Sequence, residues 1–265
     1  MTSAAMIETV IAIAQQAGRA ILAVYARDFE VETKADASPL TEADMASHRI
    51  IAEGLGQLAP RVPLLSEEGA QIPWETRRQW TRWWLVDPLD GTREFVKRNG
   101  EVTVNIALIE NGAPVLGVVH APVGDYLVHA QRGVGAFLRD PATGKDIAIN
   151  SQNPAPSPLR VTASRSHLDE RTARVLERIG DHEREGVGSS LKFCRIAEGR
   201  ADVYPRFGPT SEWDTAAGQC VLEAAGGCVL GLDGEPFRYN RGESLLNPDF
   251  FALGDPSLPW RDWVA

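Results

Sequence analysis

Cysteine is scarce in this chain. Cys194, Cys220 and Cys228 are the three cysteines among 265 residues, and they form no C-x-x-C pair. An odd number of separated cysteines is typical neither of a disulfide-stapled secreted protein nor of a thiolate zinc site. The five histidines show no metal-ligand spacing either. The sequence therefore favours a reducing, cytoplasmic location and gives no sign of a zinc centre.

Positive charge is also in short supply. The chain has 27 Lys and Arg residues against 36 Asp and Glu residues, for a formal net charge of −9. Polymeric nucleic acid is bound through clustered positive charge, so this balance argues against such a partner. It does not exclude a small phosphorylated substrate, because bound divalent cations can reverse the local field.

Long hydrophobic runs are missing. By inspection, no apolar run approaches the roughly 20 residues of a membrane span, and the N-terminus lacks the pattern of a signal peptide. Internal repeats and low-complexity tracts are absent as well. The hydrophobic content of 43% and charged content of 24% are ordinary for a globular protein. A chain of this length can form one large domain or two packed ones.

The first half is predicted to contain two helices followed by a sheet rich in antiparallel strands. Apolar residues at three- and four-residue steps predict helices over residues 3–26 and from about 39 to 58, with a short strand over 29–33 between them. Asn111-Gly112 is a hairpin signal. The strands are expected over residues 62–65, 83–86, 101–109, 114–120, 126–130 and 134–138.

The second half is predicted to alternate strands and helices. Residues 140–158 carry four prolines, and this stretch is the expected boundary between an α+β part (residues 1–155) and an α/β part (residues 156–265). Strands are expected over 159–163, 201–204 and 228–232, the last being the final strand of the core. Helices are expected over 167–179, 191–198 and 212–225, with glycines just beyond the last two.

Residues 83–95, WWLVDPLDGTREF, carry the clearest chemical pattern. A buried strand is expected to stop at Asp87-Pro88, because proline cannot donate to a strand ladder. Asp90 follows three residues later, and Gly91 and Thr92 can open a helix. Two carboxylates and the Leu89 carbonyl suit a hard cation, and the amides at a helix start suit an anion. A phosphate ester and its metal ions require both.

Acidic residues recur at strand ends and helix starts elsewhere. Glu67 precedes Gly69 at the end of a short strand, whereas Asp44 and Asp214 lie in the first turns of expected helices. Taken singly, each has an ordinary explanation, as a solvated acid or as a complement to the helix dipole. If Glu67, Asp87, Asp90 and Asp214 converged, their repulsion would require more than one bound cation.

Three motifs resemble those of one family. DPLDGT, WDTAAG and the upstream SEEG are similar, in that order, to the motifs of the magnesium-dependent, lithium-sensitive inositol monophosphatase family. The resemblance implies a layered αβαβα fold and two or three Mg²⁺ ions, with Li⁺ and Ca²⁺ inhibitory. It implies metal ligands at Glu67, Asp87, the Leu89 carbonyl, Asp90 and Asp214, and a catalytic set of Thr92, Glu67 and Asp44. It places the phosphate against Glu67, Leu89, Asp90, Gly91, Thr92 and Asp214.

Two longer segments, around residues 90–122 and 188–218, resemble bacterial 3'(2'),5'-bisphosphate nucleotidases of the CysQ type. That resemblance implies removal of the 3'-phosphate from adenosine 3',5'-bisphosphate, and action on its sulfated form as an extension. It assigns Gly188, Ser189, Ser190 and Lys192 to a second phosphate, although this Gly-Ser-Ser run has the alternative of only capping a helix. It also implies a small nucleotide substrate, often a homodimer, and in some members peripheral association with the inner membrane.

Two other functions stay open. An inositol or sugar monophosphatase has the same fold, although the KFC and YPRFGPT segments disfavour it. A non-catalytic protein that binds a phosphorylated ligand is a different class, and the presence of every ligand acid argues against it. Hydrolysis of the bisphosphate compared with inositol 1-phosphate separates the first two, and ligand binding without phosphate release would identify the third.

Overall fold

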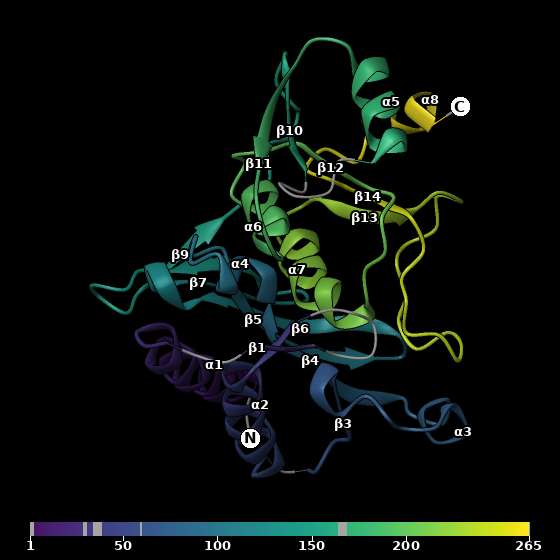
Figure 1. The fold of residues 1–265 in the computed structure, drawn as a ribbon. Helices are drawn as coiled ribbons and strands as arrows, with labels where there is room; N and C mark the ends of the chain where they lie inside the picture. The colour runs from purple at the N-terminus through teal and green to yellow at the C-terminus, as the bar shows by residue number, and fades with distance from the viewer. Residues whose placement is uncertain (1–2, 29–30, 34–38, 59, 164–168, 265) are drawn as a thin grey trace.

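The structure, a computed structural model, describes residues 3–28, 31–33, 39–58, 60–163 and 169–264. Figure 1 shows five layers, in which three layers of helices alternate with two sheets. This arrangement confirms the predicted αβαβα fold. One outer layer contains α1 (Ser3–Tyr25) and α2 (Glu42–Gly56), and the central layer contains α6 (Leu191–Ala197) and α7 (Glu212–Ala224). The other outer layer contains α5 (Glu170–Ile179) and α8 (Trp260–Val264).

In the first layer, α1 begins where the sequence predicts, whereas α2 begins later. Between them, β1 (Val31–Thr33) pairs with β2 (Pro39–Thr41). The start predicted for α2 at residue 39 is therefore wrong, because Pro39 lies in β2 and Thr41 caps the helix by accepting a hydrogen bond from the Ala43 amide. Residues 29–30 of the predicted first strand lie outside the described residues.

The large sheet has the strand order β3-β4-β5-β6-β7-β8-β9, with β3 parallel to β4 and the other pairs antiparallel. These strands are β3 (Leu64–Ser66), β4 (Arg82–Asp90), β5 (Thr103–Glu110), β6 (Ala113–Ala121), β7 (Tyr126–Gln131), β8 (Gly135–Arg139) and β9 (Asp146–Ile149). Short helical turns between and beside them are η1 (Glu67–Gly69), α3 (Trp74–Arg77), α4 (Thr92–Val96) and η2 (Pro122–Gly124).

Strand β4 does not stop where the sequence indicates. It runs through Asp87 and Pro88 to Asp90, with a register shift between Asp87 and Asp90 in its pairing with β5. Such an irregularity accommodates a proline in a ladder and redirects the side chains beside it. The bend predicted at Asp87-Pro88 is therefore a bulge inside the strand.

The small sheet has the strand order β11-β10-β12-β14-β13. Its strands are β10 (Leu159–Ala163), β11 (His182–Gly186), β12 (Val203–Arg206), β13 (Cys228–Gly231) and β14 (Phe250–Leu253). The prediction that residues 228–232 form the last core strand is wrong, because β14 pairs between β12 and β13. The sequence also does not predict β11 and α8. Residues 167–168 of the helix predicted over 167–179 lie outside the described residues.

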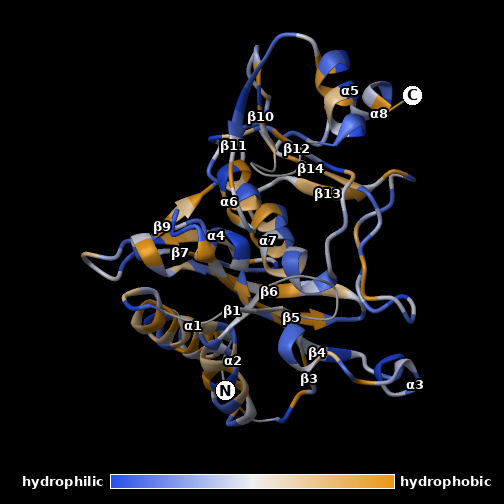
Figure 2. Ribbon diagram, viewed as in Figure 1, coloured by the Kyte–Doolittle hydropathy of each residue, from blue (hydrophilic) through white to orange (hydrophobic). Residues whose placement is uncertain are grey.

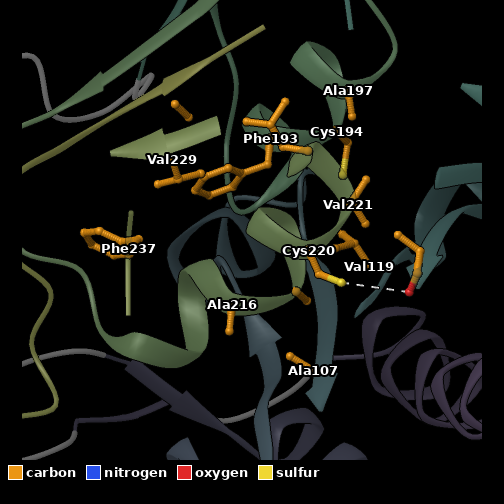
Figure 3. Packing of buried hydrophobic residues seen from close by; sticks show 14 of the residues in the cluster. Ala107, Val119, Phe193, Cys194, Ala197, Ala216, Cys220, Val221, Val229 and Phe237 are labelled. Carbon is orange, nitrogen blue, oxygen red and sulfur yellow. Dashed lines mark hydrogen bonds between the residues drawn. The ribbon is translucent and has the colours of Figure 1, made fainter. Parts of the chain in front are cut away.

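The central helices join the two sheets. Figure 3 shows Phe193 and Cys194 of α6 and Cys220 and Val221 of α7 in one buried cluster with residues of the large sheet. Helix α7 approaches β6 closely at Gly117, which has no side chain. A Cβ at this position would lie 2.6 Å from the Ala217 carbonyl oxygen. In Figure 2 apolar residues gather where these layers meet. The boundary at residue 155 stays a prediction, and this core draws residues from both sides of it.

Helix α1 is the most apolar helix of the first layer. Within the described residues, its Ala4–Tyr25 part alone has the length and composition to cross a membrane, with a mean hydropathy of 1.3. This corrects the expectation that no segment approaches such a composition. Half of the tested window is buried inside the protein, and Val10, Ala14, Ala17 and Ile21 are fully buried in the core beside the large sheet.

Candidate active site

The bulge of β4 and the glycine turn after it set the positions of Asp87 and Asp90. Asp87 is buried, and its Oδ1 accepts a hydrogen bond from the Leu89 amide at 3.0 Å. Gly91 follows with a φ of +87°, which L-residues rarely adopt, and it caps α4. A Cβ at this position would lie 2.9 Å from the Glu101 carbonyl oxygen. Glycine is therefore required for the turn that sets Asp90 beside the start of α4.

Acids from distant parts of the chain meet at this bulge. Among the described residues, carboxylate oxygens of Asp87, Asp90 and Asp214 lie within 4.8 Å of one another. Asp214 comes from the first turn of α7, where its Oδ2 accepts a hydrogen bond from the Ser211 amide at 2.9 Å. Glu67 begins η1, after β3, and hydrogen-bonds to Asp87. The structure thus brings together the acidic positions that the sequence singled out.

The cluster is electrostatically strained without a cation. Burial raises the pKa of Asp87 well above its usual range, and the charges of Glu67, Asp90 and Asp214 raise it further. Burial, followed by the charge of Asp90, raises the pKa of Asp214 to about 8. Burial also raises the pKa of Asp90, although Lys192 and the Ser190 amide oppose that shift. Oxygen donors crowded in this way match what a hard divalent cation binds, so these residues fit Mg²⁺.

Thr92 lies beside the cluster and contacts Asp44. The Thr92 hydroxyl is 3.3 Å from Asp44 Oδ1 and 3.4 Å from the Leu89 carbonyl oxygen. The other Asp44 oxygen, Oδ2, accepts hydrogen bonds from the Thr41 amide at 2.8 Å and the Thr41 hydroxyl at 2.7 Å. Asp44 therefore takes part in the cap of α2 with Thr41, a role beyond the predicted complement to the helix dipole, and in addition it orients Thr92.

The 188–190 segment connects the two sides of the site. The Ser190 amide donates to Asp90 Oδ2 at 2.7 Å, and the Gly188 amide donates to Glu101 Oε2 at 2.9 Å. The Ser190 hydroxyl donates to Asn105 Oδ1 at 2.6 Å. These two amides are thus bonded to carboxylates of the first half of the chain. The Ser190 amide holds Asp90 in place, a contact that the sequence does not predict.

Lys192 is a buried cation next to the acids. Burial lowers its pKa to about 8, against the opposing charge of Asp90. Its Nζ donates to the Ser189 carbonyl at 2.5 Å and lies 5.1 Å from the centre of the Tyr204 ring. The lysine is thereby held at the wall of the cavity that adjoins the carboxylates.

That cavity has a volume of about 310 Å³ and opens over Asp90 and Asp214. Gly91, Thr92, Gly188, Ser189 and Lys192 line it, whereas Ser190 lies beneath the surface. Sequence reasoning did not select the lining residues Arg93, Tyr204, Arg206, Thr210 and Thr215. Tyr204 and Arg206 belong to the YPRFGPT segment, which could have indicated them. On sequence grounds this segment serves only to disfavour an inositol or sugar monophosphatase.

Comparison with known proteins bears on this geometry. The model of the inositol monophosphatase family matches residues 3–253. The chain belongs to this family. A 3'(2'),5'-bisphosphate nucleotidase CysQ of Salmonella typhimurium is 51% identical over 247 residues, which is 92% of this chain and 98% of that protein. The corresponding protein of Haemophilus influenzae is 37% identical over 257 residues, which is 97% of this chain and 95% of that protein.

Solved structures of the family agree with this assignment. The crystal structure of CysQ from Bacteroides thetaiotaomicron matches with a TM-score of 0.83 and 40% identity, over 94% of this chain and 97% of that chain. An inositol monophosphatase of Thermotoga maritima matches with a TM-score of 0.75 and 26% identity, over 92% of this chain and 90% of that chain. The predicted family and the nucleotidase resemblance are therefore confirmed.

Proposed function

We propose that the protein is a Mg²⁺-dependent 3'(2'),5'-bisphosphate nucleotidase that converts adenosine 3',5'-bisphosphate into AMP and phosphate. The identity of 51% to a CysQ nucleotidase along almost the whole of both chains carries this conclusion. The acidic cluster, of which Asp90 and Asp214 line the cavity, supports it. Action on the sulfated form of the substrate belongs to the same proposal.

The metal site of the proposal consists of oxygen ligands. Asp87, Asp90 and Asp214 supply the carboxylates that lie within 4.8 Å of one another. Glu67 and the Leu89 carbonyl complete the set, and two or three Mg²⁺ ions would be held there. Bound Mg²⁺ supplies polarisation of the phosphoryl oxygens and lowers the pKa of water at the site. Li⁺ and Ca²⁺ are expected to inhibit.

The proposed catalytic residues orient the attacking water. The Thr92 hydroxyl donates its hydrogen to Asp44 Oδ1 at 3.3 Å, so its oxygen lone pairs are available to accept a hydrogen bond from water. Asp44 itself is held by Thr41, so it fixes the hydroxyl direction. Glu67, as a carboxylate in the same cluster, is the proposed acceptor of the water proton.

The substrate is proposed to span the cavity. The scissile phosphate would lie at Leu89, Asp90, Gly91 and Thr92, between the carboxylates and the start of α4. The residues proposed for the second phosphate are Gly188, Ser189, Ser190 and Lys192. Ser190 contributes indirectly, because its amide bonds Asp90 beneath the cavity surface. The ammonium group of Lys192 lines the cavity and provides the positive charge there.

The remaining expectations are part of the same proposal. The partner is a small nucleotide, and neither the charge of −9 nor the cavity of about 310 Å³ suits a nucleic acid polymer. A cytoplasmic location, a homodimer and peripheral association with the inner membrane stay predictions. Gel filtration with light scattering tests the dimer, and cell fractionation tests the location.

Substrate comparison is the deciding experiment. The purified protein is assayed for Mg²⁺-dependent phosphate release from adenosine 3',5'-bisphosphate, its sulfated form and inositol 1-phosphate. The proposal expects kcat/KM to be at least about tenfold higher for the bisphosphate, the value of roughly one well-placed additional contact. A preference for inositol 1-phosphate would instead establish the monophosphatase alternative. Calorimetric binding of the bisphosphate without phosphate release would establish a binding protein.

A further inference from the structure

The residues that flank Asp214 are held by a segment that no catalytic motif marks. Residues 240–247, here called the strap, lie between β13 and β14, and Figure 1 shows this yellow part of the chain descending beside α7. The side-chain nitrogen of Asn247 lies 2.7 Å from the Ser211 carbonyl oxygen. It also lies 3.1 Å from the hydroxyl oxygens of Thr210 and Thr215. One amide group therefore contacts both sides of the first turn of α7.

Backbone groups of the strap reinforce this contact. The Asn247 amide donates to the Thr210 carbonyl at 2.8 Å, and the Leu245 carbonyl accepts a hydrogen bond from the Glu212 amide at 2.9 Å. The Asn240 amide donates to the Glu212 carboxylate at 2.7 Å. Four residues within four positions of Asp214 are thus bonded to the strap. Amides at a helix start have no partner within the helix, so bonds of this kind fix where the helix begins.

The other end of the strap is bonded to the segment that follows Glu67. Arg77 of α3 is only 2% exposed, and it donates to Asn240 Oδ1 at 2.7 Å and to the Glu243 carbonyl at 2.8 Å. Asn240 Nδ2 donates back to the Arg77 carbonyl at 2.6 Å. Arg77 also donates to the Ile72 carbonyl at 3.1 Å. The strap consequently bridges the part of the chain after Glu67 and the part that carries Asp214.

We propose that Asn247 is a positioning residue for the reaction and that the strap holds Asp214 in register with Glu67. Asp214 is placed through the turn that Asn247 contacts, because its carboxylate accepts from the Ser211 amide while Asn247 bonds the Ser211 carbonyl. Thr210 and Thr215 line the cavity, so the same side chain also fixes its wall. The inference rests on the proposed role of Asp214 as a metal ligand.

Two substitutions of Asn247 separate its hydrogen bonding from its shape. Asn247→Ala removes the side chain, and Asn247→Asp keeps the size but replaces the donating nitrogen by oxygen. Partners that orient metal ligands are worth about 10- to 100-fold in metal affinity or activity. Both variants are therefore expected to weaken Mg²⁺ binding, measured by calorimetry on the ion-free protein, and to lower kcat by about tenfold or more. KM for the bisphosphate should change less than kcat.

Ser244→Ala is the matched control inside the strap. The Ser244 hydroxyl is exposed and accepts a hydrogen bond from the Leu246 amide, a contact that stays within the strap. This variant should keep the Mg²⁺ affinity and kcat of the wild type. Asn240→Gly serves as a second variant, because glycine tolerates the φ of +55° while the bonds to Arg77 are lost. It too should weaken Mg²⁺ binding.

The outcomes are distinct. If both Asn247 variants and Asn240→Gly bind Mg²⁺ as the wild type does, the inference is overturned, and so it is if they lose only thermal stability. If an Asn247 variant does not fold, the Asn240→Gly result decides. If the wild type releases no phosphate from the bisphosphate, the proposed function is overturned instead. That result concerns the wild type alone and does not depend on the variants or the control.

Discussion

Asp90 accepts hydrogen bonds from both halves of the chain. Its Oδ2 accepts from the Ser190 amide at 2.7 Å and from the Asn105 side chain at 3.4 Å. Burial raises the pKa of Asp90, and the charge of Lys192 is the largest effect that opposes this shift. A carboxylate with donors from both halves of the chain is fixed in position before any ligand arrives. Its charge is then available to a cation without rearrangement.

Replacement of Asp90 tests that charge. Asp90→Asn keeps the shape of the side chain but removes one negative charge from the cluster. We expect Mg²⁺-dependent turnover to fall by at least about 100-fold, since the lost group is a proposed ligand. Circular dichroism and thermal unfolding should show a folded protein, because one fewer buried carboxylate reduces repulsion. Asp181→Asn on the exposed surface is the control, and near-normal activity of Asp90→Asn would remove it from the ligand set.

The residues of this site differ in how far the sequence reveals them. Glu67, Asp90 and Asp214 stand next to glycine, proline or a helix start, and those neighbours make them recognisable. Asn247 is a polar residue of the irregular segment between β13 and β14, where neither periodicity nor capping patterns apply. The partners of its side chain, Thr210, Ser211 and Thr215, come from a distant part of the chain, so these contacts depend on the tertiary fold. The sequence alone therefore does not indicate these contacts.

At the scale of elements, the turn from β4 into α4 is the most constrained feature. Gly91 has a φ of +87°, and the Gly91 carbonyl accepts from the Phe95 amide at 2.8 Å as α4 begins. The bulge before it and the helix after it set the direction of Asp90 and Thr92. Backbone geometry at one residue therefore controls two proposed site groups.

Gly91→Ala should disturb this turn. An added Cβ would meet the Glu101 carbonyl oxygen at 2.9 Å in a conformation that alanine disfavours. We expect the free energy of unfolding, measured in urea, to fall by about 1–3 kcal/mol and activity to fall with it. Gly56→Ala, at the end of α2, has open space around the new methyl group and should be neutral. Equal stability of the two variants would contradict the strained turn.

Elements were predictable where an apolar pattern was long. Strands β5 and β6 contain extended apolar runs, and α1 has an apolar stripe of more than five turns, so the pattern predicts each of them close to its observed bounds. The start of β4 is predicted in the same way, but its end is not, because the strand continues through Pro88 to Asp90. Strand β11 has the sequence HEREG and is mostly exposed at a sheet edge, so no pattern marks it. Strand β14 has only four residues after a long irregular segment, and its interior place in the sheet depends on pairing with β12 and β13.

On the scale of the whole molecule, the acidic cluster opposes the stability of the ion-free fold. Burial, followed by the charge of Asp90, raises the pKa of Asp214 from 3.8 to about 8. Between these values the folded protein retains a proton that the unfolded chain has released. The free energy of unfolding contributed by this group is therefore highest at low pH and falls as the pH rises toward 8.

Removal of Mg²⁺ should expose this dependence. We expect chelation to lower the Tm, and we expect the Tm gain from saturating Mg²⁺ to be larger at about pH 8 than at about pH 6, where protons compete for the carboxylates. Thermal unfolding at the two pH values, with and without Mg²⁺, provides the measurement. A Tm gain that is equal at both values, or larger at the lower one, would show that Asp214 does not titrate as described.

The position of β14 has a consequence for synthesis of the chain. This strand fills the gap between β12 and β13, yet Phe250–Leu253 come after both of them in the sequence. Until these residues leave the ribosome, the small sheet is incomplete, and the segment that contains the strap is joined to that sheet only through β13. This segment gains its second attachment to the small sheet when β14 pairs between β12 and β13. Folding of the strap against the first turn of α7 is therefore expected to be a late event during synthesis of the chain.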